Sequence, residues 1–253
     1  DLFIAGVGPG ILMFLLFAVY SYFYARKANI PLQEKVNWAG RAKALKKAIG
    51  PLGFPIIIFV GIYGGFFSPT ESAAIAVLYA FILEFFIFKT IKLKDIKRIA
   101  LSTAVSTSIV FILVAGGQLF SWVISFAKIP QMMTNAVLGA NPSATRILVT
   151  VTLFFFIAGM FVDSLVAIII LSPIFYPIAM LAGIDPIHLG IVITLQAAIA
   201  SVSPPFGCNI FTACAIFNRP YLDIVKGIPP YLIMLLLTTI IVIFVPELSL
   251  FLL

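Results

Sequence analysis

Long apolar runs without charge constrain the fold of this chain more than any other feature. One of them, residues 99–127, contains 29 residues and no Asp, Glu, Lys or Arg. A helix of about 20 apolar residues is enough to cross a bilayer. Apolar residues make up 62% of the chain and charged residues 10%, against roughly 45–50% and about 25% in soluble domains. The sequence therefore predicts an all-α polytopic membrane protein, and it argues against soluble enzymes, secreted disulfide-rich domains and nucleic-acid binders.

Hydropathy predicts about six spans, a re-entrant helical hairpin and a discontinuous helix. The predicted spans are residues 2–24, 51–67, 70–88, 99–127, 188–217 and 223–245. Ser68-Pro69 separates the second span from the third, since proline is favoured in the first turn of a helix. The apolar residues within 34–49 repeat at helical spacing beside basic ones, which indicates an amphipathic helix in the membrane interface.

Basic residues set the predicted orientation. Residues 25–50 hold seven Lys and Arg, residues 89–98 hold five and residues 219–226 hold two, so fourteen of the sixteen lie on one side of the predicted spans. Because short loops rich in Lys and Arg stay in the cytoplasm, this side is predicted to be cytoplasmic. Both ends of the chain are then expected outside.

A carboxylate lies at the tip of the predicted hairpin. Residues 144–158 and 165–182 form arms of about 15 and 18 residues around the tip segment 159–164. At 1.5 Å per residue the arms reach about 22–27 Å, which is short for a full span. Asp163 is the sole acidic residue between 96 and 184, and a charge at membrane depth costs a few kcal/mol. Asp163 and Ser164 are therefore candidate site residues, with helix capping as the alternative role of Asp163.

A second break interrupts the span 188–217. Pro204 and Pro205 have no N–H, so the carbonyls of Ala200 and Ser201 are expected to lose their helical partners. Neutral oxygen groups of this kind suit a hard cation such as sodium, whereas a simple proline kink is the alternative. The candidate sodium-binding residues are Ala200, Ser201, Ser203, Pro204, Gly207, Asn209 and Thr212.

A weak internal repeat relates the two ends of the chain. At an offset of 221 residues, five positions match: Gly6, Pro9, Met13, Leu15 and Leu16 align with Gly227, Pro230, Met234, Leu236 and Leu237. The first and last helices are also predicted to run in opposite directions, as an inverted-topology repeat requires. The chain is therefore expected to hold the end of one repeat and a complete second repeat, and to be a fragment of a longer protein.

Four sequence strings, taken together, resemble a known family. They are residues 61–74, 159–164, 185–190 and 203–209, which read GIYGGFFSPTESAA, GMFVDS, DPIHLG and SPPFGCN. In this order they are similar to the large membrane subunit of tripartite ATP-independent periplasmic (TRAP) transporters. Ser203 and Cys208 stand where that family often has threonine and leucine.

The resemblance implies sodium-coupled uptake of an organic acid, such as sialic acid or a C4-dicarboxylate, by an elevator mechanism in the bacterial inner membrane. It implies sodium as the coupling ion without a further cofactor. The implied partners are a periplasmic substrate-binding protein, a small membrane subunit and the first half of the large subunit. Gly159, Asp163 and Ser164 are then expected to bind substrate. A channel and a membrane-embedded hydrolase are the alternatives; the polar residues gather at two breaks instead of lining a pore, and an aspartyl dyad would need a second deep aspartate.

The resemblance also divides the chain into segments. These are residues 1–24, the last helix of the first repeat; 25–50, a cytoplasmic amphipathic connection; 51–127, scaffold-type helices; 128–222, the transport-type hairpin and broken helix; and 223–253, the final span and tail.

Overall fold

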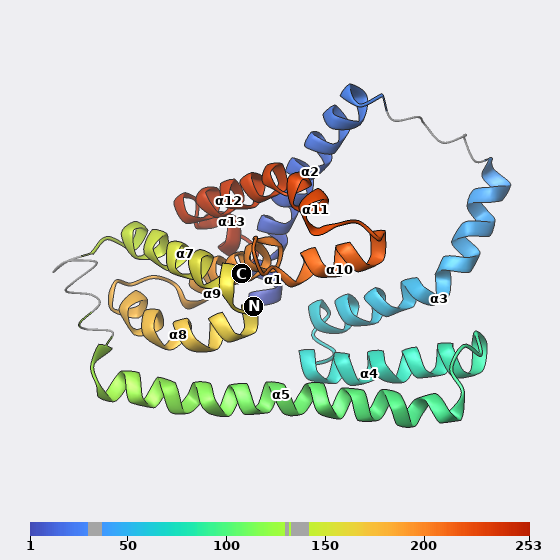
Figure 1. Ribbon diagram of the computed structural model, residues 1–253, viewed down its shortest axis with the longest axis horizontal. Helices are drawn as coiled ribbons and strands as arrows, with labels where there is room; N and C mark the ends of the chain where they lie inside the picture. The colour runs from blue at the N-terminus through green and yellow to red at the C-terminus, as the bar shows by residue number, and fades with distance from the viewer. Residues whose placement is uncertain (30–36, 130–131, 133–141) are drawn as a thin grey trace. The chain divides into compact units, whose positions relative to one another are not determined.

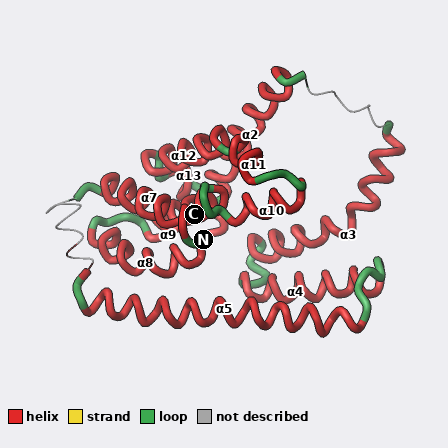
Figure 2. The backbone as a smooth tube through the Cα atoms, viewed as in Figure 1, coloured by secondary structure: helices red, strands yellow, loops and turns green. Residues whose placement is uncertain are grey.

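The computed structural model describes residues 1–29, 37–129, 132 and 142–253, and regular structure within them is entirely helical (Figures 1 and 2). The elements are α1 (Leu2–Ala5), α2 (Val7–Lys27), α3 (Trp38–Tyr63), α4 (Pro69–Ile82), η1 (Leu83–Ile87), α5 (Leu93–Phe126), α7 (Ala144–Phe161), α8 (Ser164–Leu181), α9 (Pro186–Val202), α10 (Cys208–Phe217), α11 (Tyr221–Gly227), α12 (Pro229–Phe244) and α13 (Glu247–Leu250). This confirms the predicted all-α class.

Six helices among the described residues are long and apolar enough to cross a membrane, which confirms a polytopic membrane protein. They include both arms of the predicted hairpin, α7 and α8, with 18 residues each. The first arm is therefore longer than the 15 residues expected, because the helix continues to Phe161. Length alone does not separate a re-entrant arm from a span, so the re-entrant topology stays a prediction.

The chain forms two compact units. One comprises Asp1–Ala28 with Val110–Leu253, and the other comprises Asn29–Ile109. Helix α5 begins in the second unit and ends in the first. The repeat and elevator roles assigned to the sequence segments stay predictions.

In the unit Asn29–Ile109, the predicted amphipathic connection and the next span form one helix. Asn37 caps α3 by accepting a hydrogen bond from the Gly40 N–H at 2.8 Å. The helix then runs through Pro51 and Pro55 without interruption, and it bends along its length in Figure 1. No helix end therefore marks the expected boundary at residue 50, because a proline inside a long helix can kink it without ending it; the division of roles there stays a prediction. Residues 30–36 of the predicted connection lie outside the described part.

The tight turn predicted before Pro69 is confirmed. Ser68 and Glu71 form a capping box, in which the Ser68 N–H donates to Glu71 Oε2 at 2.8 Å and the Glu71 N–H donates to Ser68 Oγ at 3.3 Å. Helix α4 then packs against α3, and the Tyr79 hydroxyl donates to the Gly50 carbonyl at 2.9 Å. Glu71 therefore has the structural role that its place in the first turn suggests.

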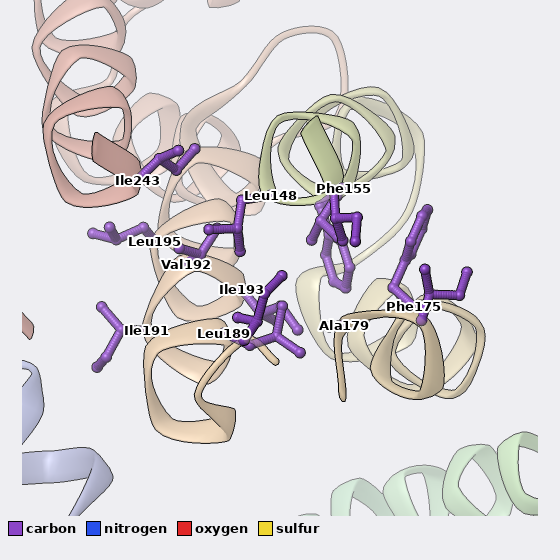
Figure 3. Close-up of a cluster of buried hydrophobic side chains, with 14 of the residues drawn as sticks. Leu148, Phe155, Phe175, Ala179, Leu189, Ile191, Val192, Ile193, Leu195 and Ile243 are labelled. Atoms are coloured by element: carbon purple, nitrogen blue, oxygen red, sulfur yellow. The ribbon is translucent and has the colours of Figure 1, made fainter. Parts of the chain in front are cut away.

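In the unit that contains the hairpin, the core forms where α9 packs between its neighbours. Helix α9 contacts α7, α8 and α12, and its first turns also contact α1 and α13. Figure 3 shows the cluster of buried side chains that these helices share. Its labelled members are Leu148, Phe155, Phe175, Ala179, Leu189, Ile191, Val192, Ile193, Leu195 and Ile243. The helix that the prolines break is thus also the most enclosed helix of this unit.

Two buried polar contacts join α9 to the C-terminal helices. The Gln196 side chain donates to Thr239 Oγ1 on α12 at 3.2 Å, and His188 Nδ1 lies 2.7 Å from Ser249 Oγ on α13. Both Gln196 and His188 are buried. Interhelical hydrogen bonds of this kind hold helices together where the hydrophobic effect between them is weak.

The predicted final span is a bent pair of helices. Helices α11 and α12 meet at Ile228 with an angle of 46°. Helix α13 follows in the segment that the sequence suggested was only a tail. Gly8 on α2 lies so close to α13 that an added Cβ would overlap the Leu248 carbonyl and would lie 2.8 Å from the Phe251 ring.

We expect Gly8→Ala to destabilise the protein by about 1–3 kcal/mol, because the backbone of Leu248 cannot turn away as a side chain could. Gly10→Ala is the matched control, since an added Cβ there has nothing within 4 Å. Thermal unfolding in mild detergent should show a lower midpoint for the first variant alone. Equal midpoints for the two variants would contradict the close approach of α2 and α13.

Candidate functional site

The hairpin tip lies where the sequence places it. Helix α7 ends at Phe161 and α8 begins at Ser164, so Val162 and Asp163 form the non-helical turn. Asp163 Oδ1 accepts a hydrogen bond from the Leu165 N–H at 2.9 Å, which makes it the N-cap of α8. The Asp163 side chain is exposed at the surface of the described chain. The capping role is therefore present, and the exposed carboxylate remains available for a ligand.

The predicted break in the next span is also present. Helix α9 ends at Val202 and α10 begins at Cys208, leaving Ser203–Gly207 as an irregular segment. The Ala200 carbonyl has no i+4 partner, since residue 204 is proline, but it is not left free, because it accepts a hydrogen bond from the Ser203 N–H at 3.2 Å. Tightening of the last helical turn into an i to i+3 bond is a common way to satisfy terminal carbonyls. Pro205, in contrast, has no N–H to offer the Ser201 carbonyl.

The polar side chains of the break divide into two groups. Asn209 Nδ2 donates to Ser201 Oγ at 3.1 Å, so these residues meet across the irregular segment. Ser203 Oγ is buried and donates to the Ile199 carbonyl at 2.7 Å. Thr212 Oγ1 donates to the Cys208 carbonyl at 3.1 Å within α10. Ser201 and Asn209 thus form a shared polar cluster, in which the Ser201 hydroxyl also donates to the Ala198 carbonyl of its own helix at 2.7 Å. The Ser203 and Thr212 hydroxyls likewise bond to their own helical segments.

Gly207 allows the carbonyls of the break to approach one another. Its N–H donates to the Ser203 carbonyl at 2.9 Å. An added Cβ would lie 2.8 Å from the Ser201 carbonyl oxygen and 2.9 Å from the Ser203 carbonyl oxygen. Gly207 is also the N-cap of α10 and has no side chain to accept from the first N–H groups of that helix. Carbonyl oxygens and an uncapped helix start therefore lie together.

The structure brings the hairpin tip and the break together. Ser164 Oγ donates to the Ala197 carbonyl at 2.9 Å, and the Phe206 N–H donates to the Met160 carbonyl at 3.3 Å. Gly159 is buried against α9, where an added Cβ would overlap the side chain of Ala200. The predicted substrate-binding and sodium-binding residues are thus parts of one connected region.

Several contacts of this region were not predicted from the sequence. Met160 and Ala197 contribute backbone carbonyls, which every residue has, so their side chains give no signal. The Tyr221 hydroxyl donates to the Pro205 carbonyl at 2.9 Å, from a residue placed after α10. A tyrosine beside a basic segment is typical of membrane interfaces, and nothing in the sequence relates it to the break.

We expect Gly207→Ala to destabilise the protein by about 1–3 kcal/mol, since the surrounding atoms belong to the backbone and must move. The control is Gly227→Ala, where an added Cβ has nothing within 4 Å. Thermal unfolding of both purified variants in detergent measures the difference. A Gly207→Ala protein as stable as the control would show that the carbonyls are not packed around this glycine.

Comparison with known proteins places this arrangement in a family. A family model described as the DctM component of the tripartite ATP-independent periplasmic transporter matches residues 1–248. The chain is 52% identical to the ectoine TRAP transporter large permease protein TeaC of Halomonas elongata, over all of this chain and 59% of the relative. It is 49% identical to the ectoine/5-hydroxyectoine large permease protein UehC of Ruegeria pomeroyi, again over 100% of this chain and 59% of the relative.

A more distant relative has the same kind of name. The C4-dicarboxylate TRAP transporter large permease protein DctM of Pseudomonas aeruginosa is 36% identical over 98% of this chain and 58% of the relative. The chain therefore spans about three fifths of the length of the relatives it matches. These relatives are named as transporter subunits, not as enzymes, and the family is one of integral inner-membrane proteins. The chain belongs to the family of large membrane subunits of tripartite ATP-independent periplasmic transporters.

Proposed function

We propose that the chain is part of a sodium-coupled secondary transporter that takes up a small organic acid of the ectoine class. This proposal rests on one observation: the hairpin tip contacts the broken helix. Ser164 bonds to the Ala197 carbonyl, and Phe206 bonds to the Met160 carbonyl. Helix breaks that meet at one place supply free N–H groups for anions and free carbonyls for cations. Both kinds of group are present in this region.

Identity among relatives favours the ectoine class over the substrates expected from sequence alone. The relatives named as ectoine transporters share 52% and 49% of residues with this chain. Those named for C4-dicarboxylates and sialic acid share between 31% and 36%. We therefore place an ectoine-like solute ahead of sialic acid and C4-dicarboxylates.

The site offers groups that can pair with both charges of such a solute. Ectoine is a zwitterion, with a carboxylate and a delocalised cation on one small ring. In the proposed complex the Asp163 carboxylate faces the cationic part, and the uncapped start of α10 faces the substrate carboxylate. Ser164 and Gly159 contribute the shape of the tip.

For the coupling ion, we propose that sodium binds the oxygen groups around Gly207. The carbonyls of Ser201 and Ser203 and the side-chain oxygens of Ser201 and Asn209 supply neutral hard ligands. Pro204 contributes by interrupting the helix, and the Ala200 carbonyl retains a second lone pair beside its bond to Ser203. Thr212 is not a direct ligand of the ion in this proposal, since its hydroxyl bonds to the Cys208 carbonyl within α10.

The proposed partners follow from the family. A periplasmic substrate-binding protein delivers the solute, a small membrane subunit assists, and the first half of the large subunit completes the site in an elevator mechanism. Bound sodium stabilises the joined tip and break, so sodium and substrate tighten each other by linkage.

The test of this function is ectoine uptake into proteoliposomes by the complete transporter with its binding protein. We expect uptake to need an inward sodium gradient, and excess C4-dicarboxylate or sialic acid not to compete. Potassium in place of sodium is the control. Uptake that persists in potassium and collapses with a proton uncoupler would contradict sodium coupling, and competition by C4-dicarboxylates would contradict the substrate class.

Two substitutions distinguish a role of the Asp163 charge in transport from its role as the N-cap of α8. Asp163→Asn keeps the oxygen that accepts from Leu165 but removes the charge, whereas Asp163→Ala removes both. We expect both variants to lose most uptake while the Asn variant keeps wild-type stability and the Ala variant loses about 1 kcal/mol. Asp185→Asn is the matched control, because Asp185 caps α9 in the same way. Wild-type uptake by Asp163→Asn would leave Asp163 with the capping role alone.

A further inference from the structure

One peptide group in the break is held from both sides. The N–H of the Pro205–Phe206 peptide donates to the Met160 carbonyl at the end of α7, at 3.3 Å. The carbonyl of the same peptide accepts from the Tyr221 hydroxyl at the start of α11, at 2.9 Å. In a trans peptide the N–H and the C=O point in opposite directions. The end of α7 and the start of α11 therefore lie on opposite sides of this peptide and fix its orientation together.

The break has few other backbone donors that could fix it. Pro204 and Pro205 have no N–H, so the Phe206 N–H is the first donor after Ser203. The next donor, Gly207, bonds to the Ser203 carbonyl. The orientation of the Pro205–Phe206 peptide consequently determines where Gly207 and the carbonyls beside it lie.

The ring of Tyr221 packs against α10. Its side chain is half-buried, and its ring lies 5.7 Å from the Phe211 ring of α10, centroid to centroid, at an interplanar angle of 32°. The ring contact and the hydroxyl contact use different parts of the side chain. The hydroxyl can therefore be removed while the packing against α10 is kept.

We propose that Tyr221 is a positioning residue for the coupling ion. By holding the Pro205 carbonyl, its hydroxyl keeps the Ser201 and Ser203 carbonyls arranged around Gly207 before the ion binds. A site that is already ordered binds more tightly, because the ion does not have to order it. Tyr221 itself does not touch the ion. This inference rests on the sodium coupling proposed above.

The test is Tyr221→Phe in the complete transporter, which keeps the ring and removes the hydroxyl. We expect the sodium concentration for half-maximal uptake to rise about two- to tenfold, the factor that corresponds to one net hydrogen bond. Maximal uptake at saturating sodium should stay near the wild-type value. Equilibrium binding of radioactive sodium to the purified transporter should weaken by the same factor. Tyr176→Phe is the matched control and should change neither quantity, because Tyr176 is an exposed residue of α8.

The outcomes separate this inference from the proposed function. Sodium-dependent uptake with an unchanged midpoint in Tyr221→Phe would overturn the role of Tyr221 and leave sodium coupling in place. A fall in maximal uptake without a change in midpoint would show a merely structural role and would also overturn it. Uptake by the unmodified transporter that does not depend on sodium would overturn the coupling ion itself, and with it this inference.

Discussion

The need to satisfy backbone polar groups away from water governs the arrangement around the broken helix. A bilayer offers no hydrogen bonds, so irregular backbone at membrane depth is tolerated where protein surrounds it. Here the groups released between α9 and α10 find partners on other helices: Met160 of α7 accepts from Phe206, and Tyr221 of α11 donates to Pro205. The irregular segment is thus held by helices on both sides of it.

Small residues make this enclosure possible. Gly159 lets α7 approach α9 at Ala200, and Gly207 lets backbone oxygens of the break gather around one carbon. Gly8 does the same for α2 and α13. Close backbone approach is the usual basis of helix association in membranes, because burying larger apolar side chains gains little relative to lipid. The candidate site and the helix packing therefore both depend on glycines that allow close backbone approach.

Helix α9 is anchored in its first turn and near its middle as well as at the break. Gln196 bonds to Thr239 on α12, and His188 bonds to Ser249 on α13. Ser249 Oγ donates its hydrogen to the Pro246 carbonyl, so His188 Nδ1 must be the donor in the contact with Ser249. These buried contacts fix α9 over most of its length, which leaves the segment Ser203–Gly207 as the place where the chain departs from helical geometry.

The sequence by itself determined the helical class, the helix breaks and the helix start at Pro69. These follow from local chemistry: apolar runs of span length, prolines without an N–H, and the preference of proline for the first turn of a helix. It also located Asp163 and the Pro204–Pro205 segment. Tertiary structure decided which partners the released groups find. The Ala200 carbonyl is not free but accepts from the Ser203 N–H. Likewise, α3 continues through Pro51 instead of ending there. Met160, Ala197 and Tyr221 join the region through contacts between residues distant in sequence, and a backbone carbonyl or a lone tyrosine carries no local pattern that could reveal them.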